Sequence, residues 1–273
     1  MVPSLENYKM KSTAESQKEL IERLLVLEKE RGRRPKKRDN NSLYKNSRRL
    51  FGSWNKMMEA AGYEVRFIQK VESITFDNDF YYFLGLLITD GHICRVLKTK
   101  DFKIAIYTSY PEERELIIKL IKKLFNYNAY FSSKFASYNK KPNYEIRVCS
   151  KGLVNLLIDK WSIPSGSKSS IVRIPRKIKE GDLKAKQSFV RGVIDGDGSI
   201  TKYGIKITSG SILFLEDLKK LLINIGIRSG SVLKERETTF TLRINRHLDL
   251  LKIKAFYGEG SYYPRKKESL NKI

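Results

Sequence analysis

Hydrophobic residues along the chain follow two periodicities, one typical of helices and one typical of strands, and the two alternate in a regular order. Residues 15–30 place four leucines at helical spacing among Glu, Lys and Arg, and Gly32 and Pro35 end that stretch. A second short helix is expected to end at Gly62. The N-terminal residues therefore predict a small helical module.

From about residue 79 onward the same order of elements is expected twice. The first half is predicted to contain helix 79–89, strands 93–97 and 103–109, a helix that Pro111 opens, strands 130–136 and 144–148, and helix 153–161. The second half is predicted to contain helix 184–196, strand residues over 200–208, helix 214–225, strands 232–236 and 239–245, and helix 248–256. The predicted fold class is α+β, with two pseudo-symmetric αββαββα halves and a small N-terminal helical domain. The predicted domains are residues 1–70, 74–170 and 171–273.

Two short segments of the chain, residues 83–91 and 190–198, are nearly the same. Each ends an apolar run with Asp-Gly, which places Asp90 in register with Asp197 at a separation of 107 residues. Gly85 and Gly192 then coincide as well. A repeated unit with a repeated carboxylate suits a substrate that is itself two-fold, such as duplex DNA.

The repeated aspartates are expected at the ends of two helices, where the helix dipole disfavours a carboxylate by a few tenths to ~1 kcal/mol. A divalent cation bound beside the carboxylates would offset this unfavourable interaction. Gly85 and Gly192 lack side chains, so two helices can approach closely there and bring Asp90 and Asp197 side by side. Paired hard oxygen ligands are what Mg²⁺ (or Mn²⁺) requires for phosphodiester hydrolysis. For either segment alone, a glycine-capped helix with an exposed Asp is the simpler interpretation.

The charge balance narrows the partners that the chain can have. Fifty-four Lys and Arg against 30 Asp and Glu leave a net charge of +24, which favours a polyanionic partner, nucleic acid first. The chain has only two cysteines and two histidines, so we do not expect a disulfide framework, a zinc site or a His-based triad. No apolar stretch reaches membrane-spanning length and no signal peptide is recognisable, so we expect a soluble protein of the cytoplasm or of the organelle that makes it, without a membrane partner.

Long basic side chains gather on the positions that the predicted strands turn outward. A twisted antiparallel ribbon bearing such residues fits the major groove of DNA, although an antiparallel sheet with one wet face is also ordinary. In the N-terminal module the run from Arg31 to Arg49 carries nine Lys or Arg and a single acid, Asp39, which favours phosphate contact over a merely solvated face. The predicted DNA-binding residues are Lys103, Lys134, Arg147, Lys202, Lys206, Lys234, Arg236, Arg243, Asn245, Arg48 and Arg49.

Two resemblances to known families follow from these motifs. Gly32-Arg33-Arg34-Pro35, Phe51-Gly52-Ser53-Trp54-Asn55 and Ala60-Ala61-Gly62-Tyr63 resemble the short repeat attached to homing endonucleases, which implies a helix-turn-helix-like DNA-binding appendage. The duplicated segments, over about residues 75–273, resemble the LAGLIDADG homing endonuclease family in its single-chain, two-motif form. The segment 163–169, followed by Ile174-Pro175, is similar to the one that joins the two halves in that family.

The LAGLIDADG resemblance implies two saddle-shaped halves that grip a long, imperfectly palindromic DNA site as a monomer. It implies Asp90 and Asp197 as catalytic metal ligands, and a lysine beside each scissile phosphate. Lys168 is similar to the first of these lysines, and Lys266 or Lys267 to the second; we take Lys267 as the catalytic candidate. The implied reaction is Mg²⁺- or Mn²⁺-dependent cleavage of both strands, giving 5′-phosphate and 3′-hydroxyl ends with short 3′ overhangs.

Other interpretations keep the same fold or the same charge without the cleavage. A non-cleaving binding protein on this scaffold, such as an intron RNA maturase or a DNA-binding regulator, is the main alternative. The presence of both dipole-disfavoured aspartates argues against it. A basic structural protein of a ribosome or nucleoid predicts neither a duplicated acid nor glycines inside helices. The Met1 start and the plain Ile273 end favour a freestanding or intron-encoded frame over an intein.

Overall fold

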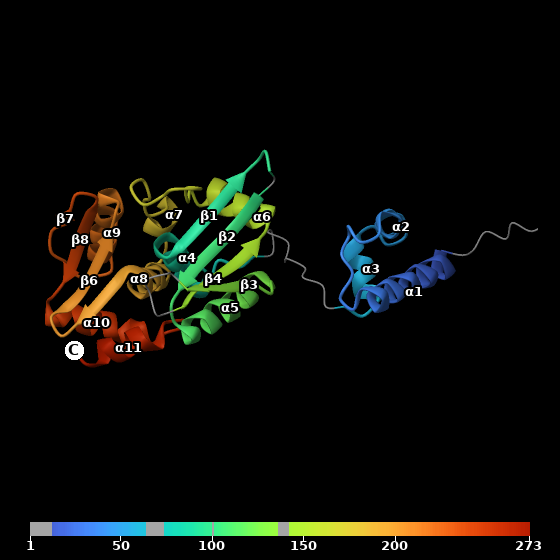
Figure 1. The fold of residues 1–273 in the computed structure, drawn as a ribbon. Coiled ribbons are helices and arrows are strands. Elements are labelled where there is room, and N and C mark those ends of the chain that lie inside the picture. The colour runs from blue at the N-terminus through green and yellow to red at the C-terminus, as the bar shows by residue number, and fades with distance from the viewer. Residues whose placement is uncertain (1–12, 64–73, 100, 136–141) are drawn as a thin grey trace, which may run out of the picture. The chain divides into compact units, whose positions relative to one another are not determined.

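The structure is a computed structural model that describes residues 13–63, 74–99, 101–135 and 142–273 (Figure 1). The side chains of Lys134 and Phe135 lie outside the described part of the chain. The chain divides into two compact units, residues 1–67 and residues 68–273. Each unit is described by itself.

The N-terminal unit contains three helices, α1 (Thr13–Arg31), α2 (Asn41–Phe51) and α3 (Trp54–Ala60). The prediction of two helices missed α2, which occupies the basic stretch. The Asn40 side chain caps α2 by accepting from the Leu43 amide at 2.9 Å, and Gly52 ends the helix at φ +77°. The many polar and basic residues of this stretch hid its narrow apolar stripe. The buried core of the unit comprises Leu20, Leu24, Leu27, Leu43, Trp54, Met57 and Met58.

The larger unit contains two halves with the predicted αββαββα order, so the α+β fold class is confirmed. The first half comprises α4 (Asn78–Thr89), β1 (Gly91–Val96), β2 (Asp101–Thr108), α5 (Pro111–Phe125), β3 (Tyr130–Phe135), β4 (Pro142–Cys149), α6 (Lys151–Asn155) and the π-helical turn η2 (Leu156–Lys160). The second half comprises α8 (Leu183–Asp197), β5 (Gly198–Thr201), β6 (Gly204–Ser209), α9 (Ile212–Asn224), β7 (Leu233–Arg236), β8 (Thr239–Ile244) and α10 (His247–Tyr257). The short helix α7 (Arg176–Lys179) lies between the halves, and α11 (Pro264–Asn271) follows them.

Each half contains a four-stranded antiparallel sheet, and the two sheets have the same topology. Their strand orders are β1-β2-β4-β3 and β5-β6-β8-β7. The glycine after each motif aspartate opens its sheet: Gly91 pairs with Ile106, and Gly198 with Ile207. The motif helices α4 and α8 pack on each other between the sheets (Figure 1), and one hydrophobic cluster contains buried residues from both halves.

Two further sequence predictions differ from the structure, and one helix near the C-terminus was not predicted. The stretch predicted as strand over 200–208 is a tight hairpin, in which Gly204 adopts φ +126°, so Lys202 lies in a turn and not on a strand. The helix predicted over 153–161 begins at Lys151, because Ser150 caps it, and its second part is π-helical. The basic residues near the C-terminus form α11, which Pro264 opens. No helix of the described residues combines the length and apolarity that crossing a bilayer requires.

Candidate active site and nucleic-acid interface

The two motif helices meet at their glycines. A Cβ atom added to Gly85 would lie 2.5 Å from the carbonyl oxygen of Phe189 and 2.9 Å from backbone atoms of Gly192. A Cβ atom added to Gly192 would lie 2.2 Å from the carbonyl oxygen of Tyr82. Because the obstructing atoms are backbone, only glycine allows this approach at either position. The structure therefore brings Gly85 and Gly192 together, as their spacing from the aspartates predicts.

Close packing at the glycines carries both motif aspartates to one end of the helix pair. Asp90 is the C-cap of α4, and Asp197 is the last residue of α8. A Cβ atom added to Gly196 would lie 3.1 Å from Asp90 Oδ2, so the end of α8 lies directly against the Asp90 carboxylate. Both carboxylates are partly buried, and within the described part of the chain neither makes a hydrogen bond or an ion pair.

Burial raises the pKa of both carboxyl groups. Burial raises the pKa of Asp90 to about 7, and the negative charge of Asp197 adds to the effect. Burial likewise raises the pKa of Asp197 to about 6, against the nearby positive charges of Lys168 and Lys266. A cation bound between these partly buried carboxylates would therefore stabilise their ionised form.

Lys168 caps the C-terminal end of α4. Its Nζ donates to the carbonyl oxygens of Leu87, at 2.9 Å, and Ile88, and it lies 3.5 Å from that of Thr89. The end of a helix leaves such carbonyls without partners and favours a positive charge. Burial lowers the pKa of Lys168 to about 8, although the charges of Asp197 and Asp90 oppose the shift.

The second lysine beside the acids is Lys266, not Lys267. Lys266 is 7% exposed, and its Nζ donates to the carbonyl oxygen of Gly198, the residue after Asp197. Lys267 instead donates to the hydroxyl of Tyr262 at 3.2 Å, and its Nζ lies 4.4 Å from the centroid of that ring. The sequence could not choose between neighbouring lysines, because the rotation of α11 decides which of them faces the acids.

The donor set at this site fits a divalent cation of the magnesium type. Among the described residues there is no group of three or more His, Cys, Asp or Glu side chains that could hold a metal ion. Two converging carboxylates are nevertheless sufficient for Mg²⁺, which commonly takes one or two carboxylates and completes its shell with water and substrate phosphate oxygens. Asp90 and Asp197 would hold the ion.

Sequence reasoning missed a buried network behind the site. Asp195, 1% exposed, accepts from the hydroxyl of Tyr82 at 2.7 Å, from the hydroxyl of Tyr257, and from the amide of Tyr263 at 2.7 Å. Burial raises the pKa of Asp195 to about 7, although these donors oppose the shift. The network ties α8 to α4 and to the segment before α11. Its signal was an acid inside an apolar run, two residues before Asp197.

The predicted DNA-binding residues lie on both sheets and in the N-terminal unit. Lys234, Arg236, Arg243 and Asn245 are exposed around β7 and β8, and Lys202 is exposed in its turn. Arg147 is paired with Glu145, and Lys206 with Glu235 at 2.7 Å, whereas Lys103 is half-buried on β2. Arg48 and Arg49 are exposed on α2. The Lys134 prediction concerns a side chain outside the described residues.

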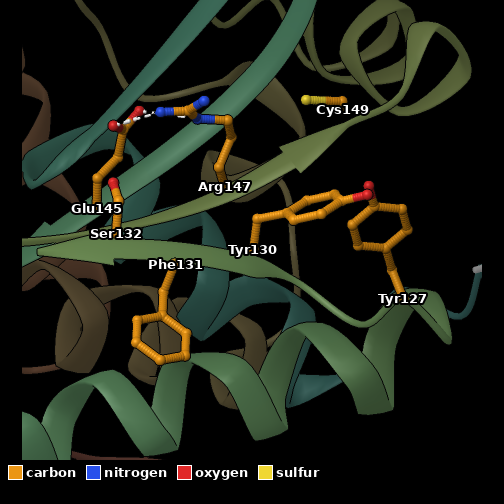
Figure 2. Close-up of a pocket in the computed structure, with 7 residues that line it drawn as sticks. All are labelled: Tyr127, Tyr130, Phe131, Ser132, Glu145, Arg147 and Cys149. Atoms are coloured by element: carbon orange, nitrogen blue, oxygen red, sulfur yellow. Dashed lines mark hydrogen bonds and ion pairs between the residues drawn. The ribbon is translucent and has the colours of Figure 1, made fainter. Parts of the chain in front are cut away.

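Each sheet bears a hollow that contains one of these arginines. Figure 2 shows the first, of about 540 Å³, with Arg147 and Glu145 on the face of the sheet away from α5 and Phe131 on the opposite face. The first hollow is lined by Tyr127, Tyr130, Phe131, Ser132, Glu145, Arg147 and Cys149. The second, of about 270 Å³, is lined by Ser199, Thr201, Tyr203, Gly204, Ile205, Lys206, Arg243 and Asn245.

Comparisons with known proteins agree with this geometry. Residues 184–256 match the family model of the LAGLIDADG-like domain, and residues 15–64 match that of the homing endonuclease associated repeat. Homing endonuclease I-ApeI of Aeropyrum pernix is 24% identical over 199 residues, which cover 71% of this chain and 86% of that protein. A probable translation initiation factor IF-2 of Thermococcus kodakarensis is 28% identical over 177 residues, which cover 63% of this chain but only 14% of that protein.

Two solved structures of similar fold are complexes with DNA. I-DmoI in complex with DNA and Ca superposes with a TM-score of 0.54 at 19% identity, over 72% of this chain and 98% of that one. The homing endonuclease I-WcaI bound to its DNA recognition sequence superposes with a TM-score of 0.55 at 13% identity, over 74% of this chain and 89% of that one. At sequence identities this low, the similarity to these structures shows a shared fold.

Proposed function

Because the chain belongs to the LAGLIDADG homing endonuclease family, we propose that it cleaves both strands of a DNA duplex at a specific site. One observation carries the proposal: Asp90 and Asp197, from equivalent positions of the two halves, meet at the end of one helix interface. A pair of equivalent carboxylates between two equivalent sheets matches the two-fold geometry of duplex DNA.

The residues around the acids suit hydrolysis without a side-chain nucleophile. Asp90 and Asp197 would hold a divalent ion, which would supply an activated water and neutralise charge at the phosphate. Water adds to phosphorus as the bond to the 3′ oxygen breaks, and that oxygen leaves as a hydroxyl after taking a proton. The products are 5′-phosphate and 3′-hydroxyl ends, with short 3′ overhangs. Lys168 and Lys266 would stabilise the negative charge that grows on the phosphate oxygens.

The two sheets supply the surface for base contacts, and the N-terminal unit supplies a second. Arg243 and Asn245 are exposed on the second sheet, where Arg suits guanine and Asn suits adenine in the major groove. Arg48 and Arg49 on α2 suit phosphate contacts, which strengthen binding without reading sequence. The chain is proposed to act as a monomer, since both halves of the two-fold arrangement lie in one chain.

The test uses the host locus from which the gene for this chain has been deleted. Purified protein with Mg²⁺ is expected to cut that DNA, and Mn²⁺ is expected to replace Mg²⁺. Asp90→Asn and Asp197→Asn should abolish cutting and leave binding within a few-fold. Glu216→Gln on α9 changes the net charge by the same amount away from the site and should cut normally. Binding without cutting by the wild type would refute the nuclease and support a maturase or regulator.

A further inference from the structure

The segment that carries Lys266 is attached to both halves of the larger unit. Arg265 and Lys266 are neighbours at the start of α11, yet their side chains reach different halves. Lys266 donates to the carbonyl oxygen of Gly198 at the end of the second motif. Arg265 instead reaches α5 of the first half, where its Nη2 donates to Glu113 Oε1 at 2.9 Å.

Glu113 is an unusual partner for a surface arginine because its own side chain is only 3% exposed. Its second oxygen accepts from the hydroxyl of Thr108 at 2.5 Å, at the end of β2. The guanidinium of Arg265, 39% exposed, also lies 4.1 Å from the ring centroid of Tyr110. A buried carboxylate costs free energy unless it is well paired, so Glu113 fixes Arg265 in one position.

We propose that Glu113 is a positioning residue, which holds Lys266 beside the carboxylate pair through Arg265. The inference rests on the proposed function, since it assigns Lys266 to one of two scissile phosphates. Only one backbone step separates Arg265 from Lys266, so a shift of α11 at Glu113 moves the Lys266 ammonium as well. Displacements of about 1 Å at a catalytic group cost about 100-fold in rate.

A second ion pair has the equivalent relation to Lys168. Five residues after Lys168, Arg173 crosses to α9 of the second half and donates to both oxygens of Asp217, at 2.9 Å and 3.1 Å. The Asp217 side chain is 4% exposed. The hydroxyl of Ser211 donates to the carbonyl oxygen of Val172 at 2.7 Å and fixes the same segment. Each lysine is therefore followed or preceded by an arginine that is anchored to a buried acid in the opposite half.

The experiment measures single-turnover cleavage of each strand of the wild-type site separately. The double variant Glu113→Gln, Arg265→Met leaves no unpaired charge, and it is expected to slow one strand by about 10- to 100-fold and to accumulate nicked DNA. Lys266→Met should slow the same strand, and Lys168→Met the other. Combining the double variant with Lys266→Met should not lower the cleavage rate of that strand any further. The exposed pair Arg176–Glu180, removed as Arg176→Met, Glu180→Gln, is the matched control and should not change the strand ratio.

Equal slowing of both strands, or a further loss in the Lys266→Met background, would overturn the inference while leaving the nuclease intact. Hydrogen exchange gives a readout that needs no cleavage. The amides of Lys266 and Lys267 bond to the carbonyl oxygen of Tyr263 at 3.0 Å and 3.1 Å. The double variant should speed their exchange at least about 10-fold and leave α10 unchanged. If the wild type does not cut, the proposed function fails, and this exchange alone decides whether Glu113 holds the segment.

Discussion

Replacing Gly192 with alanine tests the helix interface on which the site depends. The added Cβ atom would lie 2.2 Å from the carbonyl oxygen of Tyr82 and 3.1 Å from the Cα atom of Gly85. Non-bonded heavy atoms prefer separations of about 3.5 Å, so the shortfall is about 1 Å. Because both obstructing atoms belong to the backbone of α4, a side-chain rotation cannot relieve it, and the helices must separate.

The magnitude follows from two opposing terms. Inserting a methyl group into a packed core costs about 1–3 kcal/mol, and alanine returns up to about 1 kcal/mol of helix propensity over glycine. We expect the free energy of unfolding to fall by about 1–2 kcal/mol, which lowers the Tm by roughly 2–4 °C per kcal/mol in a unit of this size. DNA cleavage should fall more steeply, because separating the helices moves Asp90 away from Asp197.

The assay is a thermal melt together with a cleavage time course, and Gly230→Ala is the control. A Cβ atom at residue 230 would have the carbonyl oxygen of Arg243 as its nearest neighbour, at 3.7 Å, and the residue has no positive φ. The control is expected to melt within about 0.5 kcal/mol of the wild type. A Gly192→Ala protein that melts and cuts like the control would refute the close approach of α4 and α8.

Three further predictions concern the acids and the N-terminal unit. With EDTA present, Asp90→Asn should stabilise the protein at pH 8 by up to about 4 kcal/mol and should not stabilise it at pH 3. The pKa of Asp90 is about 7 in the folded state against 3.8 in the unfolded state, so the ionised carboxylate destabilises the folded protein only as pH rises through that window. Urea denaturation at both pH values checks this. Tyr82→Phe removes a donor to the buried Asp195 and should cost about 1–3 kcal/mol in the same melts. Deleting residues 1–67 should reduce the slope of log binding constant against log salt by several units, measured by titration at graded salt; an unchanged slope would place the basic α2 helix off the DNA.

The order of elements and the meeting of the two aspartates could be predicted from the sequence. Periodicity defines the elements, and a fixed separation of 107 residues between Asp90 and Asp197 defines a repeat. Gly85 and Gly192, at equal distances before the aspartates, predicted which faces of α4 and α8 meet. These features depend on local spacing and on duplication, which one chain displays in full.

The supporting contacts could not be predicted, because they join residues far apart in sequence. Glu113 and Arg265 are separated by 152 positions, and no local pattern links a helix N-terminus to a tail 150 residues later. The donors to Asp195 come from three different segments. The choice of Lys266 over Lys267 needed the rotation of a helix, and α2 was hidden by the lysines and arginines that cover its exposed side.

Arginines at equivalent places in the two sheets have different surroundings. Ile106 pairs with Ile146 and Ile207 with Leu242, which makes Arg147 on β4 the counterpart of Arg243 on β8. Arg147 donates to both oxygens of Glu145, at 3.1 Å and 2.6 Å, and that pair raises its pKa further. The position equivalent to Glu145 in the second sheet is Thr241, and within the described part of the chain the Arg243 guanidinium makes no ion pair. A paired guanidinium presents fewer donors and less charge to a base than an unpaired one. The repeated interior thus preserves a two-fold site while the outer faces do not match, so the DNA site that fits both halves should be an imperfect palindrome.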